Sequence, residues 1–429
     1  MTAIVLGDVG GTNIRLQLVP GESIGSALPL ATHQARYSTA EFGHLRDALS
    51  KFAREAPSEA GRIVACALSV CGPVSEGRAV CLAQSMGPDG WVLEEADLGA
   101  ALGLGGGRLR MLNDFVAVGL AVGSRDRPAG APELLCVHEA ALAPQGTIAV
   151  LGPGTGLGSC FGVWFEAPAG GAAELQIFPS EGGESDFVAR LVPPRTLGGW
   201  GRRPGTSFRL TRAAGAPPCH SSEREWALRQ HVAASLDVTH VKVEHVVSGS
   251  GLARIYLFLR SEGAAGLRSS TFEHDDGGVN APYGDAAAAA AVEAEVRAAA
   301  DPSAAVAARG TPGEVGADEY CVAALDLFLH VLGAEAANLA LRFQAHGGVF
   351  LAGGVMAKLA PCLRARGGAA LARLRQSYLG KGHSVAAYKQ CPLYVVGIEG
   401  DALAMEGVWA FASGAKCGFR RWAQSGAVE

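Results

Sequence analysis

The chain has 429 residues, of which 49% are hydrophobic and 18% charged, and its formal net charge is −5. This length is enough for two or three domains, and the apolar content excludes a chain that is disordered overall. The negative charge, with no run of Lys and Arg interleaved with aromatic residues, argues against a nucleic-acid partner. The 59 glycines favour the close helix–sheet packing and the glycine turns of α/β proteins.

The ten cysteines are scattered, form no C-x-x-C pair and have no His partners at zinc spacing. We therefore expect buried free thiols in a reducing compartment. No charged n-region followed by an apolar segment opens the chain, and we expect no apolar run long enough to span a bilayer. These features predict a cytoplasmic protein without a membrane partner. They leave the oligomeric state open, a homodimer included.

The first predicted elements are a strand, a glycine turn and a second strand. Residues 4–6 are apolar, and Ile14, Leu16 and Leu18 alternate with polar residues after the turn. In the turn GDVGGTN, residues 7–13, the glycines let backbone N–H groups approach a phosphate closely, and an Asp at this place can hold a hydrated Mg²⁺. Taken alone, the segment is equally an ordinary glycine hairpin with an Asp in its turn.

The next elements are a helix with 3.6-residue periodicity over residues 41–56 and a buried strand over residues 61–74. RLRMLNDFVAVGLAVG then begins as a strand and becomes helical after Asp114. An Asp at a strand-to-helix junction is typical of a helix N-cap. It is also the arrangement of a general base whose carboxylate protrudes into a cleft and accepts a hydroxyl proton.

A second strand–glycine turn–strand unit spans residues 145–164, and its turn GPGTGLG carries Thr155 as a hydroxyl donor. This turn does not match G-x-G-x-x-G, and no G-x-x-x-x-G-K-[ST] occurs in the chain, so a Rossmann dinucleotide site and a P-loop are both disfavoured. A third glycine pair, Gly353 and Gly354, follows a predicted strand late in the chain and is by itself a simple turn.

Three carboxylates surround a glycine pair in FPSEGGESDF, residues 178–187, which suits metal binding, acid/base chemistry, hydroxyl binding or a solvated turn. We predict loops over residues 137–144 and 191–218. An alanine-rich helix capped by Asp285 and a long helix over residues 317–343 complete the main elements. The two strand–turn–strand units indicate a duplicated α/β architecture with a cleft between its halves.

In this order the segments resemble those of the bacterial-type glucokinases, of the actin-like ATPase and sugar kinase superfamily. The resembling segments are GDVGGTN, LNDF, GPGTGLG, SEGGESDF, EHVVSGSGL and GGVFLAGGV. The resemblance implies an α/β, two-domain duplicated actin-like ATPase (ribonuclease H-like) fold with an interdomain cleft. It implies a small domain of residues 1–124 plus 400–429, and a large domain of residues 125–399 with insertions near 191–239 and 262–316.

The resemblance also implies ATP-dependent phosphorylation of glucose to glucose 6-phosphate, with ATP and Mg²⁺ as cofactors. Asp114 is implied to take the proton of the sugar 6-hydroxyl, and the implied sugar ligands are Asn113, Glu181, Glu184 and Glu244. The implied nucleotide-binding residues are Gly7, Asp8, Val9, Gly10, Gly11, Thr12, Asn13, Gly154, Thr155, Gly156, Gly353 and Gly354. Of these, Asp8 is implied to meet the Mg²⁺ of MgATP through water.

Two departures affect the sugar-binding surface. The family loop usually reads E-G-G-H, whereas this chain has Glu184 in place of the His, and Gln84 stands nearest to a family Asn. They keep open a kinase for another hexose or an amino sugar, and a non-catalytic sugar-binding regulator, against which the retained Asp114 argues. Glu181 and Glu184 should repel in a closed pocket unless sugar hydroxyls bridge them or one takes a proton. We expect Asp186 to cap a helix that starts near Phe187.

Overall fold

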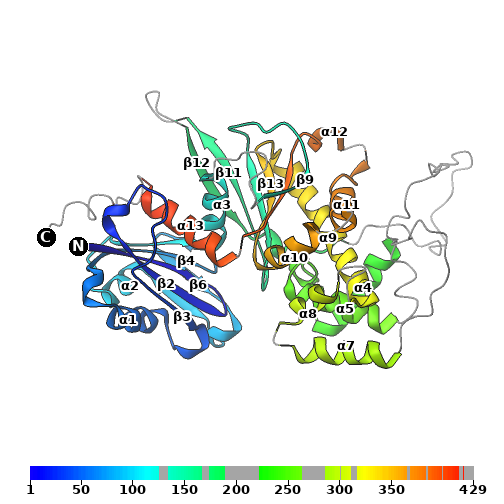
Figure 1. The fold of residues 1–429 in the computed structure, drawn as a ribbon, viewed down its shortest axis with the longest axis horizontal. Coiled ribbons are helices and arrows are strands. Elements are labelled where there is room, and N and C mark those ends of the chain that lie inside the picture. Colours follow the sequence, from blue (N-terminus) through cyan, green and yellow to red (C-terminus); the bar gives the residue numbers. More distant parts are fainter. Residues whose placement is uncertain are drawn as a thin grey trace, which may run out of the picture.

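The structure is a computed structural model. It describes residues 1–124, 134–166, 173–188, 222–262, 286–299, 301–310, 316–364, 368–382, 385–398, 400–414 and 419. Figure 1 shows two lobes side by side, the first built from the N-terminal strands and the C-terminal helix, the second from the middle of the chain. The two sheets confirm the predicted duplicated α/β fold.

The first half of the molecule is built on a five-stranded sheet of order β3-β2-β1-β4-β8. Its strands are β1 (Thr2–Val9), β2 (Asn13–Pro20), β3 (His33–Ser38), β4 (Arg62–Val70) and β8 (Leu109–Asn113). β1, β2 and β3 are antiparallel, whereas β1, β4 and β8 are parallel. β1 is central because the segment from Ala3 to Val9 is buried throughout. Helices α1 (Leu45–Glu55) and α2 (Glu95–Ala101) lie in the connections between strands.

A small three-stranded sheet extends this half. It consists of β5 (Val74–Ser75), β6 (Arg78–Cys81) and β7 (Trp91–Glu94) in the order β5-β6-β7. Single 3₁₀ turns occur at η1 (Gly21–Ser23), η2 (Thr39–Glu41), η3 (Ser58–Ala60) and η4 (Gln84–Met86). The side chain of Gln84 lies outside the described part of the chain.

The second half repeats the topology of the first in a six-stranded sheet of order β12-β11-β10-β13-β14-β9. Its strands are β9 (Leu134–His138), β10 (Ile148–Pro153), β11 (Leu157–Phe165), β12 (Glu174–Ser180), β13 (Gly348–Leu351) and β14 (Leu393–Val396). As in the first sheet, a three-stranded antiparallel unit is followed by two parallel strands. β9 is an additional antiparallel edge strand, so the loop predicted from residue 137 was wrong at Val137 and His138.

Helices cover the second sheet and fill the far end of the molecule. They are α4 (Ser222–Leu236), α5 (Gly249–Glu262), α7 (Ala286–Ala298), α8 (Pro302–Arg309), α9 (Glu319–Phe343), α10 (Gly354–Arg364), α11 (Ala369–Tyr378) and α12 (Val385–Tyr388). α7 and α9 confirm the two predicted helices, although Asp285 itself lies outside the described residues. The predicted loop over residues 191–218 also lies outside them.

The long helix α9 corrects one expectation about apolar segments. By length and composition it could cross a membrane, contrary to our expectation of no such run. Most of it is buried inside the protein, however, so it serves as the core helix of the second half. Asp318 caps its first turn by accepting a hydrogen bond from the Cys321 N–H at 2.8 Å. The eight cysteines among the described residues are free thiols, as predicted, and five of them are buried. The expected burial was wrong for Cys136, which is exposed, and Cys71 and Cys362 are half-buried.

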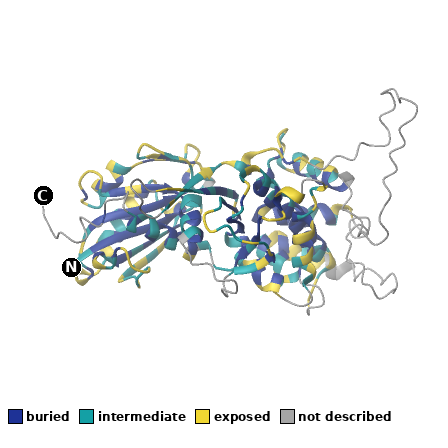
Figure 2. Ribbon diagram, turned by 90° about the horizontal axis from the view of Figure 1, so that it is seen from above, coloured by how far each residue is buried: buried dark blue, intermediate teal, exposed yellow. Residues whose placement is uncertain are grey.

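Two helices, α3 (Asp114–Ser124) and α13 (Gly400–Ser413), lie between the two sheets (Figure 1). On one side they pack against the first sheet, where Ala117 and Trp409 share a cluster with Leu6. On the other side Val118 shares a second cluster with Val150 of the second sheet. Helices buried from two sides are apolar all round, as the sequence of α3 shows. Figure 2 shows the resulting burial of the central strands. The domain boundaries implied by the resemblance stay predictions.

Candidate active site

The hairpin of β1 and β2 fixes the carboxylate of Asp8 at the end of a buried strand. Pairing across the hairpin sets Asp8 opposite Arg15, whose Nη1 donates to Asp8 Oδ2 at 3.0 Å. Ser69 on the neighbouring β4 donates its hydroxyl to Asp8 Oδ1 at 2.8 Å. Asp8 is only 8% exposed, so this ion pair and this hydrogen bond hold an ionised carboxylate in place.

The turn of this hairpin has its carbonyl groups directed into the protein. The Gly10 carbonyl accepts from the Thr39 hydroxyl at 3.2 Å, the Thr12 carbonyl accepts from the Thr39 N–H at 3.0 Å, and the Ser85 hydroxyl donates to the Gly11 carbonyl. Because C=O and N–H point in opposite directions in a trans peptide, the N–H groups that follow Gly10 and Gly11 face the other way. This arrangement suits phosphate oxygens. Gly7 and Val9 flank Asp8 within β1, and Asn13 begins β2.

The turn of the second hairpin, residues 154–156, is surrounded by other glycines. The Gly154 carbonyl accepts from the N–H of Gly249, the first residue of α5, at 2.8 Å. Gly353 has φ of +91°, a conformation that favours glycine, and a Cβ there would lie 2.9 Å from the Pro153 carbonyl oxygen. A Cβ on Gly154 or Gly354 would instead meet nothing within 4 Å. The second and third predicted turns are therefore adjacent, and both face open space. Thr155 is exposed at the tip.

Asp114 is the first residue of α3, directly after β8. The capping role belongs to Asn113, whose Oδ1 accepts from the N–H groups of Phe115 at 2.9 Å and Val116 at 3.2 Å. The Asn113 side chain also donates through Nδ2 to the Gly72 carbonyl at 3.1 Å. Asn113 is 7% exposed and fixed at both ends of its amide, which holds the adjoining Asp114 in position.

Phe115 joins α3 to the second hairpin. A Cβ on Gly158 would lie 1.9 Å from the Phe115 ring, and a Cβ on Gly152 would lie 2.4 Å from it. These two glycines face each other across the β10–β11 pair, so the ring occupies the space that two side chains would need. The hairpin therefore seats Phe115, and the preceding Asp114 lies close enough to β11 for its charge to raise the pKa of Cys160.

The electrostatic environment of Asp114 suits a proton acceptor at neutral pH. Burial, together with the negative charges of Asp8 and Glu181, raises the pKa of Asp114 to about 7, while the Phe115 N–H lowers it. Three of the carboxylates singled out in the sequence are thus close enough to interact. Glu181 lies at the start of the acidic loop and is exposed.

The acidic loop, residues 181–187, is attached to residues 240–245. Its 3₁₀ turn η6 (Gly182–Glu184) lies against β11, where a Cβ on Gly183 would be 2.2 Å from the Leu157 carbonyl oxygen. The Phe187 N–H donates to the Val241 carbonyl at 2.7 Å. Asp186 forms a β-bridge with Lys242, and its Oδ1 lies 2.8 Å from Nδ1 of His240. Phe187 and Val188 are therefore not helical, contrary to a helix start at Phe187, and residues 189 onward lie outside the described part of the chain.

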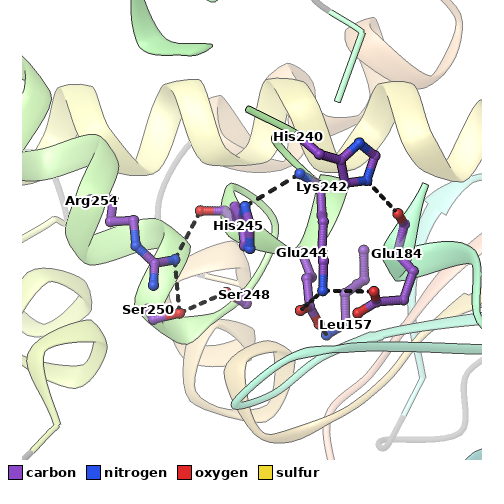
Figure 3. Close-up of polar contacts among 9 residues, drawn as sticks. All are labelled: Leu157, Glu184, His240, Lys242, Glu244, His245, Ser248, Ser250 and Arg254. Atoms are coloured by element: carbon purple, nitrogen blue, oxygen red, sulfur yellow. Dashed lines mark hydrogen bonds and ion pairs between the residues drawn. The ribbon is translucent and has the colours of Figure 1, made fainter. Parts of the chain in front are cut away.

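Glu184 and Glu244 converge on one ammonium group (Figure 3). Lys242 Nζ lies 2.6 Å from Glu184 Oε2 and 3.8 Å from Glu244 Oε1. Glu244 also accepts through Oε2 from the Leu157 N–H at 3.4 Å, which links it to the second hairpin. Glu184 is therefore paired with a cation and turned toward Glu244. The side chains of Glu184, Lys242 and Glu244 are 50%, 29% and 27% exposed.

Sequence reasoning missed Arg15, Ser69, Phe115 and Lys242. Counting outward from the first glycine turn could have found Arg15, because hairpin pairing then sets it opposite Asp8. Lys242 precedes Glu244 by two residues, but nothing in the sequence around it indicates a contact with Glu184. Ser69 and Phe115 look like ordinary core residues in the sequence, since each acts only through a partner from another element.

No group of three or more His, Cys, Asp or Glu side chains within the described ranges could enclose a metal ion. Mg²⁺ keeps several waters and is commonly bound by one or two carboxylates plus substrate phosphates. A single fixed carboxylate beside a phosphate-sized turn, as at Asp8, fits that coordination. The chemistry of these residues is therefore compatible with Mg²⁺ that arrives with its nucleotide.

The family model described as Glucokinase matches residues 5–192 and 215–413. The chain belongs to the glucokinase family. Phosphorylation of glucose is the activity of this family, and the chain is accordingly a glucose-phosphorylating kinase. The glucokinase of Synechocystis sp. is 29% identical over 373 residues, which cover 83% of this chain and 85% of that protein. The glucokinase of Nostoc punctiforme is 27% identical over 414 residues, 94% of this chain and 98% of that protein.

Solved glucokinase structures agree in fold. The structure of glucokinase from Balamuthia mandrillaris in complex with glucose has a TM-score of 0.66 at 20% identity and covers 96% of this chain and 94% of its own. Glucokinase from an Antarctic psychrotroph has a TM-score of 0.58 at 21% identity, with 95% and 98% covered. These similarities establish the two-domain actin-like fold for the glucokinase family member described here.

Proposed function

We propose that this protein transfers the γ-phosphoryl group of ATP to the 6-hydroxyl of glucose with Asp114 as general base. The observation that carries the proposal is the position and pKa of Asp114. It lies at the end of the first sheet, its side chain is brought beside the second hairpin by Phe115, and its pKa is raised to about 7. A base with a pKa near the working pH is partly ionised and yet basic enough to take a hydroxyl proton in the transition state.

The nucleotide phosphates would bind between the two hairpin turns. Gly11 and Thr12 offer backbone N–H groups on one side, whereas the Gly10 N–H donates to the Asn13 carbonyl within the hairpin. Residues 154–156 with Gly353 and Gly354 offer a close approach on the other side. The N-terminus of α10, which begins at Gly354, adds the partial positive charge of a helix end. Asp8 would hold Mg²⁺ through water, and the ion, when bound, would neutralise phosphate charge.

The sugar would bind on the side of Asp114 where Glu181 and Glu244 lie. Carboxylates are strong acceptors for sugar hydroxyls, since charge-assisted hydrogen bonds are about twice as strong as neutral ones. Asn113 can contribute the Nδ2 hydrogen that does not go to Gly72. Glu184 extends this acidic edge outward, together with Lys242. Phosphoryl transfer needs positioning and charge neutralisation more than covalent help from the protein, which these residues supply.

The decisive experiment is an assay of a hexose panel with ATP for the wild type and for Asp114→Asn. We expect glucose to be the best substrate and Asp114→Asn to lower kcat by about 10²–10⁴-fold, the usual contribution of a general base. Asp186→Asn is the matched control, because Asp186 pairs with His240 and is not assigned to the sugar. Full activity of Asp114→Asn would remove Asp114 from its role, and a different best hexose would favour the alternative specificity.

The setting of the enzyme follows the same proposal. We propose a cytoplasmic location, supported by the free thiols of the eight described cysteines, which suit a reducing compartment.

The homodimer left open by the sequence is tested by light scattering after size-exclusion chromatography. A mass of one chain at assay concentration would exclude it.

A further inference from the structure

We infer that Lys242 is a specificity-determining residue that sets the charge of the sugar-binding edge formed by Glu184 and Glu244. The inference rests on the proposed function, because it needs the sugar to bind beside Glu244. It goes further by assigning a role to a cation and by predicting which class of sugar the edge admits. Neutral hexoses and cationic amino sugars should respond differently to this residue.

The geometry of the edge carries the inference. Lys242 Nζ stands 2.6 Å from Glu184 Oε2 and 3.8 Å from Glu244 Oε1, so one ammonium group serves two carboxylates (Figure 3). Glu244 is in turn fixed to the second hairpin, where its Oε2 accepts from the Leu157 N–H and would lie 2.8 Å from a Cβ on Gly156. The three charged groups therefore form a continuous row that begins at the proposed phosphate-binding turn.

The backbone around Lys242 directs its side chain toward Glu184 and Glu244. Val241 is buried, and Lys242, which follows it in extended backbone, points to the opposite side, whereas Glu244 lies in the 3₁₀ turn Val243–His245. Val243 N–H donates to the Ser185 carbonyl at 2.8 Å, which ties the segment to the acidic loop. The Lys242 N–H donates to Nδ1 of His245 at 3.3 Å within the following turn. Lys242 therefore leaves a well-anchored backbone directly beside Glu184.

The charge of the row decides which sugars it favours. Two carboxylates and one ammonium give a local net charge of −1. Replacing Lys242 by a neutral residue gives −2, and replacing Glu184 by Gln gives 0. An uncharged sugar feels little net charge, whereas a protonated amino sugar is attracted more strongly as the row becomes more negative. Lys242 thus restrains binding of a cation in a site that is otherwise rich in carboxylates.

A second consequence concerns Glu244 as a hydrogen-bond acceptor. Burial and the neighbouring Glu184 raise the pKa of Glu244, and Lys242 lowers it. Without Lys242, two carboxylates would face each other with one counter-charge fewer, and the tendency of one to take a proton would increase. Glucose binding should then weaken, with the effect on KM rather than on kcat, because Lys242 does not touch the reacting atoms in this proposal.

The test compares glucose with glucosamine in Lys242→Met, Glu184→Gln and the double variant at mildly acidic pH, where the amino group of glucosamine carries its proton. We measure kcat/KM for each sugar, and the inhibition constant of glucosamine against glucose where turnover is slow. Relative preference for glucosamine should rise about threefold in Lys242→Met and fall about threefold in Glu184→Gln, as expected for partly exposed charges. The double variant has the wild-type local net charge of −1, so its relative preference for glucosamine should equal that of the wild type.

Two controls separate charge from structure. Lys242→Arg keeps the charge and should keep the wild-type preference, and Lys389→Met removes an exposed lysine elsewhere and should change nothing. The inference is overturned if the single variants change both sugars by the same factor, if the double variant does not restore the preference, or if glucosamine neither reacts nor competes in any variant. Failure of the proposed function looks different, because the wild type would then phosphorylate no glucose.

Discussion

The two hairpins that open the two halves have the same place in the topology but different side chains at the pair next to the last one. The penultimate pair of the first hairpin is Asp8 and Arg15, an ion pair held by Ser69. The penultimate pair of the second is Gly152 and Gly158, and the space of their missing side chains is filled by Phe115. The first hairpin thus presents an ion pair, and the second presents a space at Gly152 and Gly158 that the Phe115 ring fills and that we call the socket.

The ends of the parallel strands show the same division. In the first half β8 leads into α3, which begins with Asp114. In the second half β14 leads toward α13, which begins at Gly400, and a Cβ there would lie 3.3 Å from the Gly354 N. At these equivalent positions the first half therefore supplies the carboxylates of Asp8 and Asp114, and the second supplies glycines that allow close approach. The two sheets share one strand topology, but equivalent positions in them contribute different chemical groups to the active site.

The largest expected effect comes from filling the socket. Gly158→Ala would force a methyl group into the Phe115 ring, and overpacking of this kind costs about 1–3 kcal/mol of stability. Because Phe115 positions its neighbour Asp114, kcat for glucose should fall roughly 10²-fold, the scale of a misplacement of about 1 Å. Steady-state kinetics and thermal unfolding measure the two effects.

Gly154→Ala is the matched control, since a Cβ there meets nothing within 4 Å. It should leave the stability unchanged and act only on the KM for ATP. Equal kcat values for Gly158→Ala and the wild type would show that the socket does not position Asp114.

The next effect concerns the free energy of unfolding. The raised pKa of Asp114, about 7 against 3.8, means that the folded state binds a proton more tightly than the unfolded state between these values. The contribution of Asp114 to stability therefore falls as pH rises through this window and is least favourable above about pH 7. Asp114→Asn should then be more stable than the wild type at pH 8, on the order of 4 kcal/mol, with a smaller difference at pH 5.

Denaturant unfolding at the two pH values measures this difference. Asp97→Asn, on the exposed face of α2, is the control and should change stability by less than about 0.5 kcal/mol. A destabilised Asp114→Asn at pH 8 would contradict the assigned environment of Asp114.

A smaller effect is expected from the ion pair of the first hairpin. Arg15→Met removes the ion-pair partner of Asp8 but keeps the hydrogen bond from Ser69, so the orientation of the carboxylate is less firmly fixed. We expect the KM for MgATP to rise about fivefold, within the range for loss of a charged hydrogen bond, while the KM for glucose stays unchanged. Arg110→Met, which breaks the surface pair with Glu95, should alter neither constant.

The smallest effect should appear in the pH profile. Loss of activity below about pH 7 should follow protonation of Asp114, and the charge of Asp8 contributes to the high pKa of that group. In Asp8→Asn the remaining kcat/KM should therefore have its midpoint at a lower pH, by less than about one unit. A midpoint that stays in place or moves upward would contradict the coupling between these carboxylates.

Much of this architecture follows from local patterns. Alternating apolar residues on both sides of a glycine turn predict a hairpin wherever they occur, and parallel strands bring their ends to one edge of a sheet. The turns at residues 10–12, at residues 154–156 and at Gly353 were therefore predictable as neighbours, as was the position of Asp114 at a strand end.

The rest depends on partners that no local period reveals. Asp186 has the sequence of a helix cap, but the Phe187 N–H binds the Val241 carbonyl and the backbone stays extended. The pairing of Glu184 with Lys242 depends on the same contact between two irregular segments. β9 is short and lies at a sheet edge, where its pairing with β14 rather than its composition defines it.

The position of α13 has a consequence for synthesis on the ribosome. The face of the first sheet that holds Ile4 and Ala67 is covered by Val408 and Trp409, which are translated long after the strands they cover. At typical elongation rates this apolar face of the first sheet stays uncovered for roughly half a minute. During that time the emerging first half exposes an apolar surface that chaperones of nascent chains bind, and this surface is covered only when α13 has left the exit tunnel.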